Sequence, residues 1–270
     1  ERLARGLGVK QRVLGRWLRS GALIAALYAL IQMLVHGVDL HRHPAYTSLF
    51  LWGLLAMAAV VGAIYKDRAF CRGFCPVGLL LGTYGRGSML AVRPVSYEPC
   101  AACPDKACVR AANRSKLDAR SCPSLLNPSR LDSNSDCLVC GQCIKVCPPG
   151  NMGLFLRRPF HPGDAREPLA SWPVTLFVML VSGFVVSELC SEWKSAQAWF
   201  LWVPEEVAVR LGAAEYAGWI EGVWTLFVVP LAIWAVLGGM VVLARGASGV
   251  AEAWRRMAIP LTVLIAVGHM

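Results

Sequence analysis

Cysteine is the residue type whose spacing carries the clearest chemical information in this chain. Of its 11 cysteines, eight lie in one stretch between Cys100 and Cys147, and each half of that stretch ends in Cys-Pro. The second half has the spacing C-x2-C-x2-C-x3-C-P, which is typical of thiolates that ligate a four-iron cluster. Its members are Cys137, Cys140, Cys143 and Cys147. The first half is more loosely spaced, and its members are Cys100, Cys103, Cys108 and Cys122.

The tight run also predicts how the eight thiolates divide between clusters. Three closely spaced cysteines wrap three corners of one cube, whereas the fourth lies too far along the chain and ligates the other cube. We therefore expect two [4Fe-4S] clusters with crossed ligand sets. Cluster 1 is expected to be held by Cys100, Cys103, Cys108 and Cys147. Cluster 2 is expected to be held by Cys137, Cys140, Cys143 and Cys122.

Two other uses of clustered cysteines fit the pattern less well. Disulfides are disfavoured in a reducing compartment, which the charge distribution predicts for this stretch. A structural zinc site uses two separated C-x2-C pairs, and it explains neither the position of Cys143, three residues after Cys140, nor the Cys-Pro endings. For the looser first set, a three-iron cluster or a zinc ion stays open as an occupant.

The cysteine stretch lies between long apolar segments. The chain has 270 residues, of which 56% are hydrophobic and only 16% are charged, whereas soluble domains carry about 25% charged residues. Four uncharged stretches reach the roughly 17–25 residues that span a bilayer, namely 20–38, 44–65, 171–187 and 222–244. A fifth, 257–270, is marginal in length and runs to the last residue. Together with the first residue, Glu1, this ending indicates a fragment of a longer chain.

Charge is distributed unevenly around these stretches. The net charge is +10, and the basic residues concentrate before the first span and in the long loop that contains the cysteines. The segment 191–220 is instead rich in glutamate. The positive-inside rule therefore places the N-terminus and the cysteine loop in the cytoplasm, and 191–220 outside. No nucleic-acid motif accompanies the basic residues, so membrane topology explains them better than nucleic-acid binding.

The predicted organisation follows from these patterns. Residues 1–19 form a basic, partly amphipathic helix at the membrane interface, and 20–65 hold the first two spans. Residues 66–94 contain a Cys-x3-Cys-Pro motif and an interfacial helix that begins at Pro76. Residues 95–160 form a small polar unit with short helices and strands, ordered mainly by metal coordination. Residues 171–270 hold further spans and the external aromatic-rich segment 191–220, with a short surface helix beginning at Pro204.

Cys71 and Cys75 form a second cysteine motif. They are four residues apart, so a helical turn would bring them to one face. Cys75 precedes the expected helix start, where the helix dipole lowers the pKa of a thiol. A dithiol redox pair, a metal site or a contact to the polar cysteine unit would suit this arrangement, and two buried packing thiols are the plainer alternative. Cys190 stands alone at the end of a span and is expected to be inert.

The segment Phe-Cys-Arg-Gly-Phe-Cys-Pro-Val-Gly (70–78) after a span, followed by paired cluster motifs and further spans, resembles the membrane polyferredoxins of the NapH/NosR/CcoG type. The resemblance covers roughly residues 45–190. It implies cluster ligation by the eight cysteines and a redox role, not further defined, for Cys71 and Cys75. Such proteins are electron-transfer subunits associated with quinol oxidation, periplasmic nitrate or nitrous-oxide reduction, or oxidase maturation. The single C-x3-C-P copy and the stretched first motif leave the branch open.

Other polar residues near span ends are weaker candidates. Glu188 and Glu221 border the outer face and could accept protons from a quinol, although acidic residues at span ends are commonly just solvated. A haem is not expected, because His36 and His269 lie near span ends and a lone interfacial histidine is the usual case. His41 and His43 indicate a polar turn.

The sequence therefore predicts an all-α membrane protein: a transmembrane helix bundle of at least five spans with an inserted two-cluster ferredoxin-like domain. It is expected in the bacterial inner membrane, relaying electrons between the quinone pool or a cytoplasmic donor and a partner reductase. No catalytic residue is predicted, so an electron-transfer subunit is expected rather than a stand-alone enzyme. The alternative is a redox sensor or a metallo-enzyme maturation factor. A transporter is disfavoured because mid-span positions are almost entirely apolar.

Overall fold

The computed structural model describes Gly6, Gly8 and residues 10–114, 116, 118–158, 170–245 and 249–268. The chain folds into two compact units. The cysteine unit comprises Glu1–Leu14, Val61–Arg72 and Val77–Pro168. The helical unit comprises Gly15–Val60, Gly73–Pro76 and Leu169–Met270. Parts of the predicted segments 1–19, 95–160 and 171–270, including His269, lie outside the described residues.

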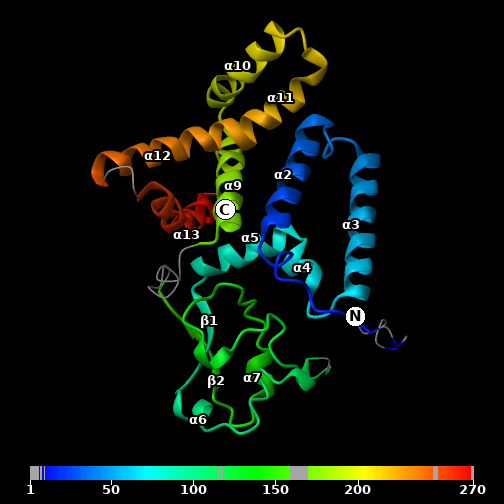
Figure 1. The fold of residues 1–270 in the computed structure, drawn as a ribbon, viewed down its shortest axis with the longest axis vertical. Coiled ribbons are helices and arrows are strands. Elements are labelled where there is room, and N and C mark those ends of the chain that lie inside the picture. The colour runs from blue at the N-terminus through cyan, green and yellow to red at the C-terminus, as the bar shows by residue number, and fades with distance from the viewer. Residues whose placement is uncertain are drawn as a thin grey trace. The chain divides into compact units, whose positions relative to one another are not determined.

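The helical unit is built around α9 (Trp172–Ser191). The other helices that lie mainly in this unit are α2 (Ala22–Gly37), α3 (Pro44–Ile64), α10 (Lys194–Arg210), α11 (Ala217–Val223), α12 (Val229–Arg245) and α13 (Val250–Gly268). Helix α9 packs against α2, α10, α12 and α13 (Figure 1). Its side chains Phe177 and Val178 are almost fully buried, as are Leu226 and Trp234 from the chain that follows α11. An apolar centre surrounded by exposed apolar side chains suits a bundle immersed in lipid.

Three helices are long and apolar enough to cross a membrane: Pro44–Ile64, Trp172–Ser191 and the continuous helical stretch Ala214–Ala244. They match the predicted spans 44–65, 171–187 and 222–244, and the chain is a multi-pass membrane protein. The predicted span 20–38 forms α2, an apolar helix of 16 residues. The predicted span 257–270 falls in α13, whose first turns also carry Glu252, Arg255 and Arg256. The structure thus supports three of the five predicted spans.

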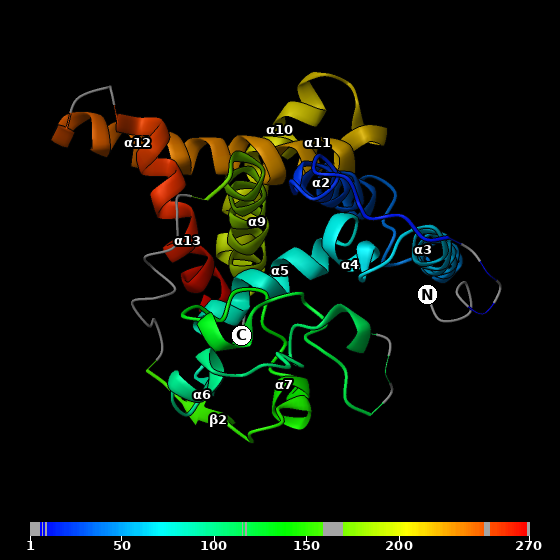
Figure 2. The ribbon, with the colours of Figure 1, turned by 60° about the horizontal axis from the view of Figure 1, so that its bottom comes forward.

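Glycine allows α2 and α11 to approach closely. Gly218 and Gly222 lie four residues apart on α11, the small-x3-small spacing that lets helix backbones meet in a membrane. A Cβ atom on Gly218 would overlap the backbone oxygen of His36, and one on Gly222 would lie 3.1 Å from the sulfur of Met33. On the other side of the contact, a Cβ atom on Gly37 would overlap the ring of Trp219. These two helices lie side by side in both ribbon views (Figures 1 and 2).

A π-helical segment, Trp224–Val228, joins α11 to α12. It ends two residues before Pro230, whose missing N–H removes one regular helical hydrogen bond and favours such a local change of winding. Gly183 of α9 lies against this segment, where a Cβ atom would overlap the backbone oxygen of Thr225 and the ring of Pro230. The wider turn is therefore accommodated by a glycine on the neighbouring helix.

Two local predictions are wrong. Residues 10–19 form no helix beyond a turn: Arg12 pairs in parallel with Tyr65, and the amide of Gln11 donates to the carbonyl of Gly62 at 2.8 Å. The last carbonyl groups of a helix have no partner within the helix. Residues 11 and 12 donate hydrogen bonds to such carbonyl groups at the end of α3, and this holds the segment in an extended form. Pro204 does not begin a helix either. It lies inside α10, which begins ten residues earlier at Lys194 and buries Phe200.

The cysteine unit contains short elements, as predicted. A two-stranded antiparallel sheet joins β1 (Leu90–Pro94) to β2 (Met152–Leu156), with Leu90 opposite Leu156 and Pro94 opposite Met152. The short helices are α4 (Ala69–Gly73), α5 (Pro76–Tyr84), α6 (Glu98–Ala101) and α7 (Gln142–Val146) (Figure 2). The helix expected to begin at Pro76 is confirmed. Since β1 precedes the first of the eight cysteines and β2 follows the last, their pairing closes the cysteine stretch into one loop.

We expect Gly218→Ala to destabilise the helical unit by about 1–3 kcal/mol, because the added methyl group overpacks the contact with α2. Thermal and denaturant unfolding in detergent measure this. Gly239→Ala is the matched control, since Gly239 is an exposed helical glycine with no atom within 4 Å of an added Cβ. Alanine has a higher helix propensity than glycine, so this control should leave the free energy of unfolding unchanged or slightly raised. Equal effects of the two substitutions would contradict the close-packing account.

Candidate iron–sulfur pockets

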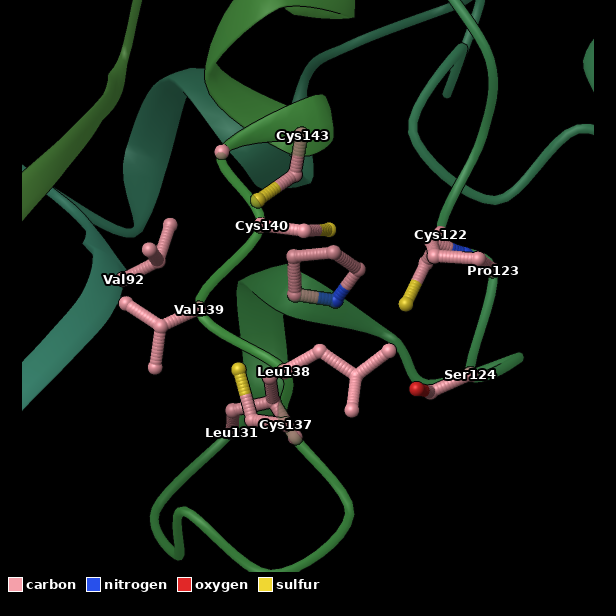
Figure 3. A pocket seen from close by; sticks show the side chains of 12 residues that line it. Val92, Cys122, Pro123, Ser124, Leu131, Cys137, Leu138, Val139, Cys140 and Cys143 are labelled. Carbon is pink, nitrogen blue, oxygen red and sulfur yellow. The ribbon is translucent and has the colours of Figure 1, made fainter. Parts of the chain in front are cut away.

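Four cysteines line one pocket in the cysteine unit: Cys122, Cys137, Cys140 and Cys143. Figure 3 shows their sulfur atoms arranged around the same space. The remaining lining is mostly apolar and includes Val92, Leu131, Leu138 and Val139. Its free volume is about 20 Å³. Cys140 is exposed, whereas the other three are partly buried.

The backbone around these cysteines turns sharply. Asp136, Val139 and Gly141 have φ angles of 58°, 49° and 68°. Left-handed residues on both sides of Cys140 reverse the chain between thiols, so that side chains close in sequence return to one space. A β-branched residue in this region is strained, and Val139 therefore stores strain beside the pocket. Helix α7 then begins at Gln142, directly after Gly141.

The other four cysteines line a second pocket in the same unit. Cys100, Cys103, Cys108 and Cys147 surround a cavity of about 180 Å³. Its wall also contains Tyr97, Asn127, Ser129 and two basic side chains, Lys106 and Arg130. The two pockets are joined through the backbone, because the amide N–H of Cys122 donates to the carbonyl of Cys108 at 2.8 Å. The structure thus brings together the same two groups of four that the spacing predicts, each with three thiols from one set and one from the other.

Burial disfavours the charged form of three of the thiols, Cys108, Cys122 and Cys143. It raises the pKa of Cys143 to about 11, with a smaller contribution from the neighbouring thiols Cys122, Cys140 and Cys137. Burial likewise raises the pKa values of Cys108 and Cys122. Four thiolates around one space repel one another, so a cationic partner is needed to hold them deprotonated. Iron bound in these pockets would supply that charge.

The spacing of the thiols also bears on the kind of metal group. Among the described residues, no three or more cysteine, histidine or acidic side chains are placed to hold a single metal ion. Four thiols spread around a common space fit a larger group with several metal atoms, whose corners lie apart. The donor chemistry, all sulfur, is that of iron–sulfur clusters.

Sequence reasoning missed two buried asparagines that hold the cysteine loops. The Nδ2 of Asn151 lies 3.2 Å from the sulfur of Cys100 and 2.7 Å from the carbonyl of Ser96. Asn134 is fully buried, donates to the carbonyl of Leu90 and accepts from Arg93. Buried amides need partners, but nothing in the spacing of Asn151 or Asn134 indicated which loops they would join. The only sequence signal was the polar composition of 95–160.

Helix α5 links the Cys71 segment to the loop before Cys137. A Cβ atom on Gly78 would overlap the carbonyl of Cys71, and one on Gly82 would lie 2.8 Å from the carboxylate of Asp136. One turn later, a Cβ atom on Gly85 would lie 3.1 Å from the carbonyl of Asn134. This glycine face lets α5 contact both segments directly. Cys71, Cys75 and Cys190 are free, partly buried thiols, and the redox role of Cys71 and Cys75 stays a prediction.

The helical unit contains a separate cavity of about 610 Å³. Its polar lining includes His36, Glu188 and Glu221, and its apolar lining includes Phe184 and Phe200. The Nδ1 of His36 lies 3.5 Å from a carboxylate oxygen of Glu221. Its Nε2 is buried and has no hydrogen-bond partner within the described part of the chain. The close approach of α2 and α11 creates this pair, since Gly37 follows His36 and Gly222 follows Glu221.

The known proteins that are similar to this chain are distant relatives, and two of those described below have names that refer to ferredoxins or electron transport. The chain is 28% identical over 156 residues to the ferredoxin-type protein NapH of Haemophilus influenzae, covering 54% of this chain and 53% of that protein. It is 26% identical over 186 residues to YccM of Escherichia coli, named as a candidate electron transport protein, covering 67% of this chain and 45% of that protein. An uncharacterized protein of Methanocaldococcus jannaschii is 31% identical over 105 residues, covering 39% of this chain and 36% of that protein.

The chain is a distant relative of the NapH ferredoxin-type proteins. Its resemblance to the NapH-type membrane polyferredoxins is thereby confirmed. The chain spans about half the length of NapH and YccM, and less of the third relative. No protein-family model matches it. No solved structure matches it either.

In this NapH relative, Gly141→Val should weaken the Cys137 loop by roughly 1–2 kcal/mol, because a β-branched side chain disfavours the left-handed region. Iron and acid-labile sulfide per chain after anaerobic purification measure the effect. Gly141→Asn is the matched control, since asparagine adopts this region more readily than other non-glycine residues. Full retention of metal by the valine variant would show that the left-handed turn does not shape the pocket.

Proposed function

We propose that this chain is a membrane-bound iron–sulfur electron-transfer protein. The observation that carries the proposal is the gathering of eight cysteines into two four-thiol pockets within one small unit. The pockets are joined by the Cys122–Cys108 backbone hydrogen bond, so they are neighbours rather than independent sites. The names of its NapH and YccM relatives support the same function.

The proposed cofactors are two [4Fe-4S] clusters. Cluster 1 is held by Cys100, Cys103, Cys108 and Cys147, and cluster 2 by Cys122, Cys137, Cys140 and Cys143. When bound, such clusters accept and release single electrons. The chain supplies thiolates, apolar walls and hydrogen-bond donors around them, and these set affinity and potential. The exposed Cys140, beside the exposed side chain of Leu138, suits a site where a redox partner protein approaches.

The proposed setting is a bacterial inner membrane with at least five spans. Helix α2 and the helix at Val250–Gly268 add to the three long apolar helices in this proposal. Basic residues concentrate before α2 and in the cysteine unit, while glutamates dominate 191–220. The positive-inside rule then supports a cytoplasmic cysteine unit. A cytoplasmic location also keeps the thiols reduced until iron binds.

Electrons are proposed to pass between the quinone pool or a cytoplasmic donor and a partner reductase. The cavity at His36 favours the quinone branch. Cavities of 300–1,000 Å³ with apolar walls and a few convergent polar groups are typical of small-molecule sites. The Nε2 of His36, which has no partner among the described residues, can accept a hydrogen bond from a hydroxyl group, and the Glu221 carboxylate lies beside Nδ1 of the same ring.

One observation favours the alternative function, a redox sensor or metallo-enzyme maturation factor. The Cys71 carbonyl lies against the same glycine face of α5 that contacts the loop before Cys137. A change at Cys71, such as oxidation or metal binding, could therefore be felt in the cluster 2 loop. Loss of a partner's metal on replacing Cys71 and Cys75, with both clusters intact, would support this alternative.

Metal content tests the proposed cofactors. Anaerobically purified protein should contain about eight iron ions and an equal amount of acid-labile sulfide per chain, as two four-iron clusters require. Cys103→Ser and Cys140→Ser should each remove or alter one EPR signal, because each removes a ligand from a different pocket. Cys190→Ser is the control and should leave both signals unchanged. A colourless sample free of sulfide would refute the proposal.

Reduction by a quinol tests the electron donor. A soluble quinol analogue should reduce the clusters of wild-type protein in detergent, followed by visible absorbance and EPR. His36→Leu and Glu221→Gln should slow this step roughly 100-fold if the pair accepts the hydroxyl protons. Glu206→Gln should have no effect, since Glu206 is paired with Arg210 on α10 and does not line the cavity. Clusters that dithionite reduces but no quinol does would indicate the cytoplasmic donor instead.

A further inference from the structure

The two cysteine pockets differ in charge and in side-chain hydrogen bonding. We propose that the pocket of Cys100, Cys103, Cys108 and Cys147 holds its cluster at a higher reduction potential than its neighbour, with Asn151 as the positioning residue that helps to set this difference. The inference rests on the proposed iron–sulfur function. It adds an order of potentials, which gives electron transfer between the pockets a favoured direction.

The side chain of Asn151 is fixed so that its amide N–H points at sulfur. Its Oδ1 accepts from the backbone N–H of Ser96 at 3.2 Å, and its backbone carbonyl accepts from the N–H of Val95 at 2.8 Å. With Oδ1 held in this way, Nδ2 faces the carbonyl of Ser96 and the sulfur of Cys100. Asn151 is 8% exposed, so water competes little for this contact.

A hydrogen bond to a ligand sulfur changes the potential of a cluster. Reduction adds negative charge, part of which resides on the sulfur atoms, and a donor N–H stabilises that charge. Hydrogen bonds to the sulfurs and net charge are among the factors that set the potentials of iron–sulfur clusters. Asn151 therefore favours the reduced form in the pocket of Cys100.

Charge acts in the same direction. Lys106 and Arg130 line the pocket of Cys100, and both are exposed. Among the described residues that line the pocket of Cys122, none is charged. Arg114 lines an adjoining cavity together with Cys122, but it is paired with Asp67 at 3.3 Å. Backbone N–H groups of Ser124 and Leu126 do lie near the sulfur of Cys122, which narrows the difference in potential. These backbone groups carry no net charge, however. The two basic side chains and the amide of Asn151 therefore still distinguish the pocket of Cys100 and raise its reduction potential above that of the other pocket.

An EPR-monitored redox titration of the intact protein tests the order. Cys103→Ser and Cys140→Ser identify which signal belongs to which pocket. The signal of higher potential should be the one altered by Cys103→Ser. If it is instead altered by Cys140→Ser, the proposed order is wrong, although the iron–sulfur function stands. Absence of iron and sulfide would overturn the function itself.

The role of Asn151 is tested by Asn151→Asp and Asn151→Ala. Both remove the N–H donor, and the aspartate keeps the shape and the acceptor for Ser96. Each should lower the potential of the Cys100 pocket so that the ratio of reduced to oxidised cluster at fixed ambient potential falls on the order of tenfold, about 59 mV for one electron. Asn134→Ala is the control, because Asn134 is also a buried amide in this unit but bonds to Leu90 and Arg93. Unchanged potentials in both Asn151 variants, or an equal shift in the control, would overturn the assignment.

The contribution of the basic side chains to the reduction potential can be measured separately through its dependence on salt. Lys106→Gln and Arg130→Gln should lower the same potential, and their effect should shrink as ionic strength rises, since exposed charges are screened. Lys116→Gln removes the same charge from an exposed position of the unit that does not line the pocket. It should shift neither potential. Salt-independent or equal shifts in all three variants would contradict the proposed role of the basic lining.

Discussion

The convergence of four thiols on each of two spaces is the constraint on which the cysteine unit depends. The unit is too polar to be held by an apolar core, and its described core side chains, such as Ala91, Val92 and Met152, are few. In the proposed function, a metal group that bridges loops distant in sequence supplies the remaining order. Left-handed turns, the pairing of β1 and β2, and asparagines that join the loops bring the thiols together. These features make the pockets, and they make them unequal.

The helical unit is governed by a different constraint. Lipid gives helices no hydrophobic reason to associate, so association depends on close contact between backbones and on buried hydrogen bonds. Glycines at the crossing of α2 and α11, and Gly183 beside the π-helical segment, provide that contact. The same crossing places His36 beside Glu221. The same crossing thus also lines a cavity with polar side chains, and this lining is the reason for proposing a ligand that carries hydroxyl groups.

Much of the architecture was readable from the sequence, and the exceptions have physical causes. The three long apolar helices were predicted because span length and absence of charge are local properties. Helix α5 was predicted because proline favours the first position of a helix, which is also a local property. The segment 10–19 was predicted as a helix from its apolar spacing, but the free carbonyls at the end of α3 bind it in an extended form. Pro204 was taken as a helix start, whereas burial of Phe200 continues α10 through it. In both cases, contacts with residues distant in sequence or burial of a side chain outweighed the local conformational preference.

The sequence by itself determined the membrane character, the eight cysteines and their division into two groups of four, because thiol spacing and hydrophobic length are written along the chain. Tertiary structure alone decided what surrounds each group: the amide of Asn151 on Cys100, the basic side chains at one pocket and the apolar walls at the other. It also decided the pairing of His36 with Glu221. These contacts join residues that are 51 and 185 positions apart, and only folding brings them within bonding distance.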